Sequence, residues 1–188
     1  MRERQEDGKS TRNIMSSIKE TRKWLLVSRG VKMKAIEIIG KGEEMHGRAY
    51  IPSGREEAGT IIKKLKENGF AHFVMLSCVD WIDKNEFELV YHMWSYEHKE
   101  HAMISVRLPR DNPSMFSMHE LFPQIETYER EIHEMYGIDF EGNSRLTPFL
   151  LEGWHDTPPM RKDFDSKKFA EDVFDSIPEI KEEEDEGI

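Results

Sequence analysis

Three histidines offer the best metal-ligand chemistry in this chain, because His92, His98 and His101 fall around one predicted β-hairpin. Zinc binds imidazole together with carboxylate, and Glu97 and Glu100 lie in the same turn. On this reading the chain is a stand-alone metal-binding enzyme. The turn is polar, however, and has no helical support or pattern of supporting ligands. Exposed side chains account for the histidines, and we expect no metal site here.

Other catalytic signatures are missing from the sequence. Cys78 is the single cysteine, whereas an iron–sulfur cluster needs about four thiolates, and its apolar surroundings predict a buried structural thiol. His119-Glu120 and His133-Glu134 lack the second histidine of a zinc-protease helix, and the chain has neither a G-x-G-x-x-G turn nor a Walker phosphate loop. We therefore expect no catalytic residue and no cofactor in this chain.

The elements that would position side chains follow from hydrophobic periodicity. Strands are predicted at Ala35–Ile39 and Arg48–Ile51, and a helix runs from Ser53 to the Asn68-Gly69 exit. The residues of its helical stripe are Ala58, Ile61, Ile62, Leu65 and Lys66.

Three strands joined by polar turns come next. Phe70–Val79 is almost continuously apolar and is predicted to be a central strand, whereas Phe87–Met93 and Ala102–Leu108 alternate between apolar and polar residues. Helices follow these strands. The order predicts an α+β fold with a mixed or antiparallel sheet, helices on one face and a long C-terminal extension.

The region after the strands is predicted to be helical. Ser117 and Glu120 have capping-box spacing for a short helix, and a longer helix begins at about Ile125 and ends at Gly137. Its apolar stripe consists of Ile125, Tyr128, Ile132, Met135 and Tyr136. The opposite side carries a charge ladder of Glu126, Arg130 and Glu134. Glu129 and Glu131 flank the stripe, where they face either solvent or a docked partner.

The predicted organisation has three parts: a basic N-terminal helical arm (residues 1–33), an α+β domain with the longer helix (34–142), and an extended partner-binding segment with an acidic tail (143–188). Apolar spacing predicts an amphipathic helix at Asn13–Val27 of the arm. Alternatively, translation begins at Met33 and the arm is not part of the native chain.

Charge and hydropathy narrow the possible partners. Residues 1–34 hold ten Lys and Arg against four Asp and Glu, in a chain whose net charge is −10. The acidic remainder offers no sustained basic groove, so a nucleic-acid partner is not expected. The chain has no run of the roughly 20 apolar residues that a membrane-spanning helix needs, and its first residues are not expected to be a secretory signal.

The longer helix and a later segment together resemble the signature of the 30 kDa subunit, also called the C subunit, of proton-pumping NADH-quinone oxidoreductase (respiratory complex I), a family shared with membrane-bound hydrogenases and sulfane reductases. The matching residues are Glu129, Arg130, Glu131, Glu134, Met135, Tyr136, Gly137, Ile138, Arg161, Lys162, Asp163 and Phe164. Gly142-Asn143-Ser144 and Asp156–Met160 stand where respiratory members carry Gly-His-Pro motifs. These departures favour the archaeal or bacterial hydrogenase or sulfane reductase branch.

The resemblance implies a non-catalytic subunit in the peripheral arm of an ion-translocating oxidoreductase, on the cytoplasmic side of the membrane. It would brace a large catalytic, nickel-iron hydrogenase-like subunit and a small iron–sulfur subunit, and would touch the membrane arm only indirectly. Iron–sulfur clusters and any nickel-iron centre would belong to those partners. The residues expected at the interface are Tyr128, Glu129, Arg130, Glu131, Tyr136, Phe149, Trp154, Arg161, Lys162, Asp163 and Phe164.

Alternatives to this reading stay open. A quinone-linked NADH dehydrogenase would use the same subunit, and the terminal electron acceptor depends on the partners. The stand-alone metal enzyme would instead rely on His92, His98 and His101, and an interaction adaptor unrelated to redox complexes would need no redox neighbours at all. For Tyr136, packing in the chain's own core competes with the interface role.

Overall fold

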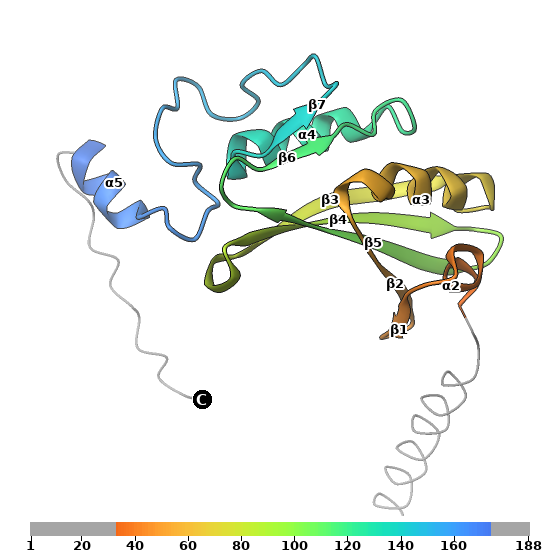
Figure 1. Ribbon diagram of the computed structural model, residues 1–188. Helices are drawn as coiled ribbons and strands as arrows, with labels where there is room; N and C mark the ends of the chain where they lie inside the picture. The colour runs from red at the N-terminus through yellow and green to blue at the C-terminus, as the bar shows by residue number, and fades with distance from the viewer. Residues whose placement is uncertain (1–32, 174–188) are drawn as a thin grey trace, which may run out of the picture. The chain divides into compact units, whose positions relative to one another are not determined.

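The computed structural model describes residues 33–173, and its elements carry the labels of Figure 1. In chain order they are α2 (Lys34–Ile39), β1 (Glu43–Met45), β2 (Arg48–Ser53), α3 (Arg55–Glu67), β3 (His72–Trp81), η2 (Ile82–Lys84), β4 (Glu86–Ser95), β5 (Glu100–Pro109), β6 (Ser114–Phe116), α4 (Ile125–Tyr136), β7 (Asp139–Glu141) and α5 (Ser166–Val173). The predicted basic arm and the acidic tail beyond Val173 lie outside the described residues.

The strands form a five-stranded sheet in the order β1-β2-β5-β4-β3 and a separate two-stranded sheet, β6-β7. Strand β2 pairs antiparallel with β1 and parallel with β5, so the larger sheet is mixed. The predicted α+β class with a mixed sheet is confirmed.

The chain divides into two compact units. The first comprises Met1–Met75 and Tyr91–Val106, and the second comprises Leu76–Val90 and Arg107–Ile188, each described only within residues 33–173. The long strands β3, β4 and β5 contribute residues to both.

In the first unit, α3 lies along the strands (Figure 1), and its predicted apolar stripe is its buried side. Ala58, Ile61, Ile62 and Leu65 are buried, as are alternate residues of β2 and β5 such as Ile51 and its register partner Ile104. Both periodicities follow from the geometry of helices and strands, which repeat every 3.6 and every two residues. These side chains form the core of the first unit.

The predicted strand at Ala35–Ile39 is wrong, because these residues belong to helix α2. The carboxylate of Glu100 accepts hydrogen bonds from the backbone N–H groups of Lys34 and Ala35 at 2.9 and 3.3 Å. Gly40, with φ of +85°, ends the helix in the left-handed conformation that glycine adopts at low cost. A side chain 65 residues away in sequence thus supplies the N-terminal cap, which no local pattern reveals.

The prediction that Phe70–Val79 forms a central strand is also wrong in its position. Strand β3 is the last strand of the sheet, next to β4 alone. Met75 and Val79 remain exposed, while Phe73 and Leu76 are buried. The apolar run reflects an exposed hydrophobic edge rather than burial on both faces.

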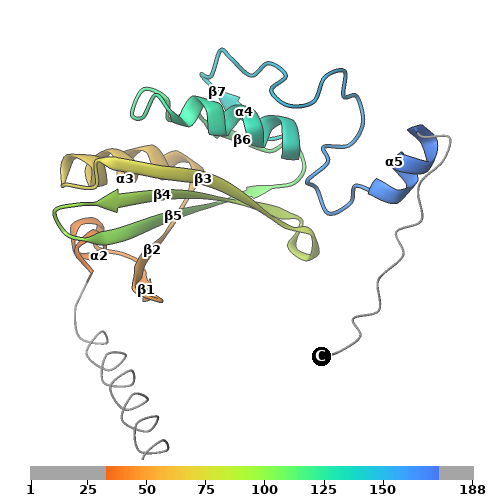
Figure 2. The same ribbon diagram turned by 180° about the vertical axis from the view of Figure 1, so that it is seen from behind.

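In the second unit, α4 connects the two parallel strands β6 and β7 and lies beside them in both views (Figures 1 and 2). Parallel neighbours need such a crossover connection. The predicted short helix after Ser117 is absent from the described residues, where β6 and turns occupy this region, because the Ser117 hydroxyl binds Glu129 instead of capping a helix. Buried Met115, Ile132 and Phe140 contribute to this unit's core.

Candidate partner-binding site

The site centres on α4, whose boundaries agree with the sequence prediction. The helix ends at Gly137, which has φ of +76° and donates its N–H to the carbonyl of His133 at 2.9 Å. A Cβ atom at this glycine would lie 3.2 Å from Cγ of Pro158. The glycine therefore ends the helix and also lets the later segment approach it closely, where the N–H of Met160 donates to the carbonyl of Met135 at 3.0 Å.

Glu129 is fully buried, with an exposed fraction of 0%. Its carboxylate accepts hydrogen bonds from the Ser117 hydroxyl (2.6 Å), the backbone N–H of Met118 (2.9 Å) and the Asn143 amide (2.9 Å). Burial raises the pKa of Glu129, and the three hydrogen bonds act in the opposite direction without cancelling it. The hypothesis that this carboxylate faces a partner is corrected, because its ligands come from within the chain and join three segments.

Glu134 holds the segment that follows β7. Its carboxylate accepts the backbone N–H groups of Phe149, Leu150 and Leu151 at 2.8, 2.7 and 3.0 Å. Burial alone would raise the pKa of Glu134, but these three bonds and the charge of Arg130 outweigh it and keep the pKa below its ordinary value. Three consecutive peptide groups are thus aimed at one side chain of α4.

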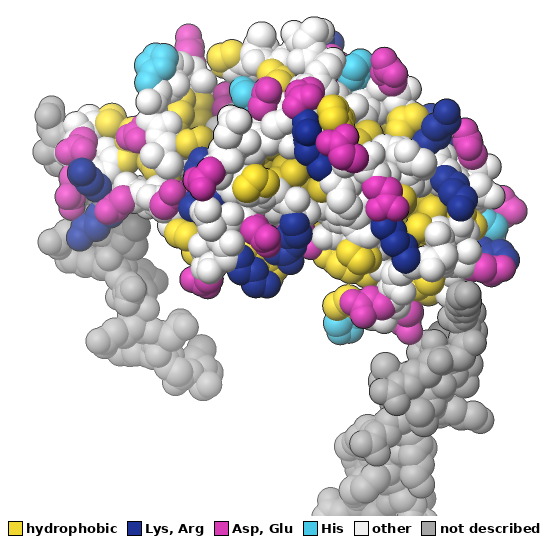
Figure 3. All heavy atoms as spheres, in the orientation of Figure 1, with side chains coloured by type: hydrophobic (Ala, Val, Ile, Leu, Met, Phe, Trp, Pro, Cys, Tyr) yellow, Lys and Arg dark blue, Asp and Glu magenta, His cyan; other side chains and the backbone are white. Residues whose placement is uncertain are grey.

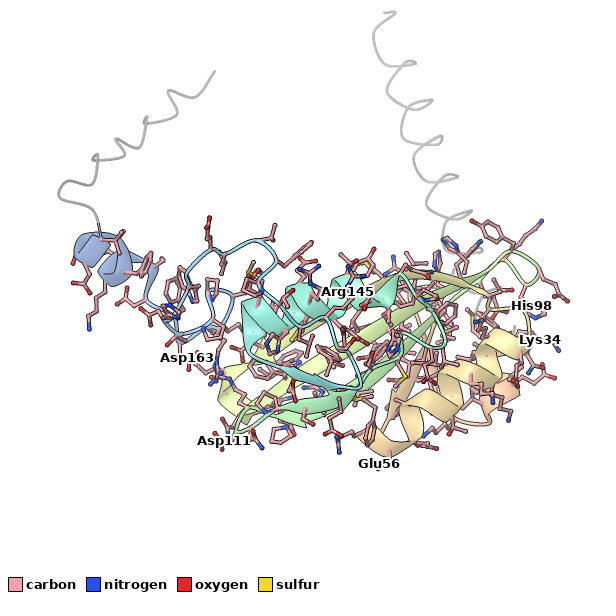
Figure 4. All side chains as sticks on the ribbon, turned by 90° about the horizontal axis from the view of Figure 1, so that it is seen from above. Lys34, Glu56, His98, Asp111, Arg145 and Asp163 are labelled. Atoms are coloured by element: carbon pink, nitrogen blue, oxygen red, sulfur yellow. The ribbon has the colours of Figure 1, made fainter. Side chains whose placement is uncertain are left out.

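Arg130 acts on the same segment from one turn earlier in the helix. Its guanidinium donates to the carbonyl of Pro148 at 3.1 Å and to the Thr147 hydroxyl at 3.3 Å, and it lies 5.0 Å from the ring centre of Phe149. Arg145 adds an ion pair with Glu126 at 3.3 Å, and Figure 4 shows Arg145 beside the helix. Of the charge ladder, only Arg130 was predicted to lie at the interface; in the structure all three of its side chains contact residues 145–151 of the same chain.

A second set of ionic contacts fixes the Arg161-Lys162-Asp163 motif. Arg110 is buried and pairs with Asp80 at 2.9 Å and with Asp163, labelled in Figure 4, at 2.7 Å. The backbone N–H of Lys162 also donates to Asp80 at 2.9 Å. Burial would raise the pKa of Asp163, but its hydrogen bond to Arg110, a backbone hydrogen bond and the charges of Arg110 and Arg161 together outweigh this effect and lower the pKa.

Aromatic residues that were predicted at the interface pack in two separate groups within the chain. Tyr136 meets Phe87 edge to face with ring centres 6.0 Å apart, and the Arg161 guanidinium lies 5.3 Å from the centre of the same Phe87 ring. Trp154 contacts Phe164 at 5.5 Å and Phe169 at 4.8 Å. Its indole N–H donates to the carbonyls of Asp156 and Thr157 at 3.1 and 3.2 Å.

The remaining predicted interface residues stay accessible. Glu131, Lys162 and Phe149 are exposed and Tyr128 is half-buried. The sequence analysis did not identify Asp80, Arg110, Asn143 and Ser117 as residues of the site. For Asp80 a signal was available, because it is a charged residue at the end of an apolar strand.

Apolar side chains remain on the outside of the fixed segment. Leu150 and Met160 are 62% and 55% exposed, and Figure 3 shows hydrophobic side chains among charged ones along this part of the molecule. A pocket of about 270 Å³ is lined by residues that include His133, Leu151 and Trp154. The arrangement presents a shaped apolar and charged surface, which is suited to binding another protein.

The positions of His92, His98 and His101 do not favour the alternative of a stand-alone metal enzyme. His92 Nε2 lies 2.7 Å from His101 Nδ1, whereas His98 Nε2 lies 3.1 Å from the carbonyl of Asn68. Within residues 33–173 no three His, Cys, Asp or Glu side chains are grouped so that they could hold a metal ion. Figure 4 shows His98 near Lys34, at one end of the first unit.

The single cysteine is half-buried. Burial raises the pKa of the Cys78 thiol, and the charges of Asp80 and Glu88 raise it further. The thiol is therefore protonated at neutral pH and a poor nucleophile. In the part of the chain that the structure covers, no helix is both long and apolar enough to cross a membrane.

Comparison with known proteins places these features in a family. Residues 52–170 match the family described as "Respiratory-chain NADH dehydrogenase, 30 Kd subunit". The C subunit of the F(420)H(2) dehydrogenase of Methanosarcina mazei is 34% identical over 138 residues, which cover 70% of this chain and 84% of the relative. The C/D subunit of the NADH-quinone oxidoreductase of Salmonella heidelberg is 30% identical over 130 residues, which cover 63% of this chain but only 21% of that longer protein.

A solved structure supports the same assignment. A chain in the structure of the membrane-bound sulfane sulfur reductase, described as an archaeal respiratory membrane complex, superposes with a TM-score of 0.71 at 28% identity. The superposition covers 82% of this chain and 95% of that one. With the matched residues spanning α3, α4 and the Arg161-Lys162-Asp163 motif, this chain belongs to the family of the 30 kDa subunit of respiratory-chain NADH dehydrogenase.

Proposed function

We propose that this chain is the 30 kDa-type subunit of a membrane-bound, complex I-like oxidoreductase of the hydrogenase or sulfane reductase type. In this role it is a peripheral subunit on the cytoplasmic side that braces a large catalytic subunit and a small iron–sulfur subunit. The iron–sulfur clusters, and any nickel-iron centre, belong to those partners. Family membership and the likeness to a chain of the sulfane reductase complex support the proposal.

One observation carries the structural part of the proposal. Glu134 and Arg130 bind residues 147–151 through six donor–acceptor contacts between them, although this segment contains no helix or strand. Leu150 stays exposed although the long loop around it is held in one shape, so its side chain adds little buried apolar surface to the isolated chain. Ordering it beforehand reduces the entropy that binding would otherwise cost, so a preformed loop favours a docking function.

The proposal explains why several charges of the family signature bind groups of this chain itself. In this view Glu129, Arg130, Glu134 and Asp163 do not reach the partner themselves. They set the backbone path of residues 143–163, and the exposed side chains of that path make the contact. The terminal electron acceptor is then a property of the partners.

Recovery of the complex from solubilised membranes tests the proposal. An affinity-tagged chain should bring down subunits that carry iron–sulfur clusters, identified by mass spectrometry. Leu150→Asp should lower their recovery at least tenfold, because it puts a charge into the apolar contact. Thr60→Asp, an equal charge change at an exposed position of α3, should leave recovery unchanged. A wild-type chain recovered without any such subunit would refute the function.

A further inference from the structure

Three histidines that the proposed function leaves unused, His72, His92 and His101, lie on one face of the sheet in the first unit. Adjacent strand residues point to opposite faces, and buried Ala49 and Ala102 lie on the α3 side. Their neighbours Arg48 and His101, paired in register, therefore occupy the other side, which we call the outer sheet face. The same registers place Tyr50 with Met103 and Met45 beside Arg48 on this face.

Aromatic and imidazole rings form a continuous band across the outer sheet face. His92 Nε2 lies 2.7 Å from His101 Nδ1, and the ring centres of Trp94 and His101 are 4.3 Å apart. Trp94 in turn lies 6.1 Å from Tyr96, whose ring centre is 5.5 Å from that of His72. All of these rings are half-buried or exposed, and Tyr96 is 72% exposed.

The composition of the outer sheet face differs from that of the rest of the chain. Tyr, Trp, Met and Arg are the residues enriched at protein interfaces, where Asp, Glu and Lys are depleted. Among the residues of β1, β2, β4 and β5 that we place on this face within the first unit, Glu43 is the one carboxylate. Glu86 and Glu88, which alternate with His92 and Trp94 along β4, belong to the second unit and pair there with Arg107. A contiguous apolar and aromatic surface of this kind marks an interaction site.

The charges on the face select the kind of partner. Arg48 is exposed, and its positive field contributes, after burial, to lowering the pKa of both His101 and His92. His92 has a pKa of about 4 and is neutral at physiological pH. The face is therefore apolar with a positive edge at Arg48, which complements a contact segment that mixes apolar side chains with carboxylates.

We propose that the outer sheet face is a second docking surface, covered in the assembled oxidoreductase by a partner polypeptide whose contact segment carries apolar and acidic side chains. This inference rests on the proposed function, since it requires an assembly. The chain's own N-terminal residues are a poorer occupant, because residues 1–34 are basic and would face Arg48. Nucleic acid is disfavoured by the negative charge of the chain.

Footprinting tests the proposal on the full chain and on the complex purified through it. Hydroxyl radicals oxidise accessible Trp94 and Tyr96, and diethyl pyrocarbonate modifies accessible His72. In the complex, all three should react at least fivefold more slowly than in the free chain. His46, in the exposed turn between β1 and β2, is the internal control. Equal reactivity of the outer sheet face in both states would overturn the proposal while leaving the proposed function intact.

Charge reversal distinguishes the partner from other occupants. Arg48→Glu should lower recovery of partner subunits at least fivefold and raise the reactivity of Tyr96 in whatever complex remains, whereas Lys63→Glu on α3 should change neither. A face that is already protected in the free full-length chain, and becomes reactive when residues 1–32 are removed, would identify the basic arm as the occupant and refute the proposal. A concentration-dependent dimer abolished by Tyr96→Glu would refute it as well, in favour of a second copy.

Discussion

The carboxylate of Glu134 accepts the backbone N–H of Leu150 at 2.7 Å, sixteen residues further along the chain. Because the N–H groups of Phe149 and Leu151 point at the same carboxylate, one side chain of α4 fixes three consecutive peptide units. Charge-assisted hydrogen bonds of this type are about twice as strong as neutral ones.

Replacing Glu134 by Ala should therefore free residues 149–151 without unfolding the chain. Loss of charge-assisted bonds leaves each N–H exposed to water, so amide exchange at these positions should accelerate at least tenfold, about 1.4 kcal/mol of local opening free energy. Hydrogen exchange with mass spectrometry measures this change. Glu131→Ala, at an exposed position of the same helix, is the matched control. Unchanged exchange at Leu150 would show that other contacts hold the segment.

Acid should release the same segment. The pKa of Glu134 is lowered in the folded chain, so its stabilising contribution is present above its ordinary pKa and is lost as pH falls through the folded value. Asp163 has the same direction of shift and should act alongside it. Exchange at residues 149–151, corrected for its intrinsic pH dependence, should rise as the pH is lowered below about 4.5. Glu134→Gln should remove most of that dependence.

Glu129 should give the opposite slope. Its pKa is raised by burial, so the folded chain binds a proton more readily than the unfolded chain does, and this group makes stability fall as pH rises from its unfolded to its folded pKa. Urea unfolding between pH 4 and 8 should therefore show a flatter decline for Glu129→Gln than for the wild type. Glu131→Gln is the control. An identical pH profile for both variants would mean that Glu129 does not titrate in this range.

Arg110→Met should be the most damaging of these substitutions to global stability. The side chain is buried between Asp80 and Asp163, and removing one partner of a buried ion pair costs about 3–5 kcal/mol because a charge is left unpaired. Denaturant midpoints measure the loss. The double variant Arg110→Met/Asp80→Leu should recover a large part of it, whereas Asp111→Asn, at the exposed neighbouring position, should have little effect. Additive losses in the double variant would contradict the pairing.

The sequence predicted elements well wherever one periodicity decides the structure. The stripe of α3 and the Gly137 end of α4 are both as expected, because a local pattern determines them. The α2 helix and the edge position of β3 were not predictable in this way. The first depends on a cap from Glu100, and the second depends on the order in which strands pair.

The candidate site was predicted less well for the same reason. The signature on α4 was visible in the sequence, but the direction of each charge was not, since Glu129 and Arg130 are neighbours with different surroundings. Glu129 accepts hydrogen bonds from Ser117 and Asn143, whereas Arg130 donates hydrogen bonds to Pro148 and Thr147. Helical spacing gives the side of the helix on which a residue lies, and only the path of the later segment decides what it meets there.

Trp154→Ala should unfold α5 selectively. An isolated helix shorter than about 12 residues is marginal in water, and α5 has 8 residues, so it depends on tertiary contacts. Phe169 of α5 supplies such a contact through the ring of Trp154. Amide exchange at residues 166–173 should therefore approach the rate of an unstructured peptide in Trp154→Ala, while exchange in α4 stays unchanged. Trp154→Phe keeps the ring contact but loses the indole N–H, so it should preserve most of the protection. If both variants lose protection equally, the hydrogen bonds to Asp156 and Thr157 rather than ring packing hold the helix in place.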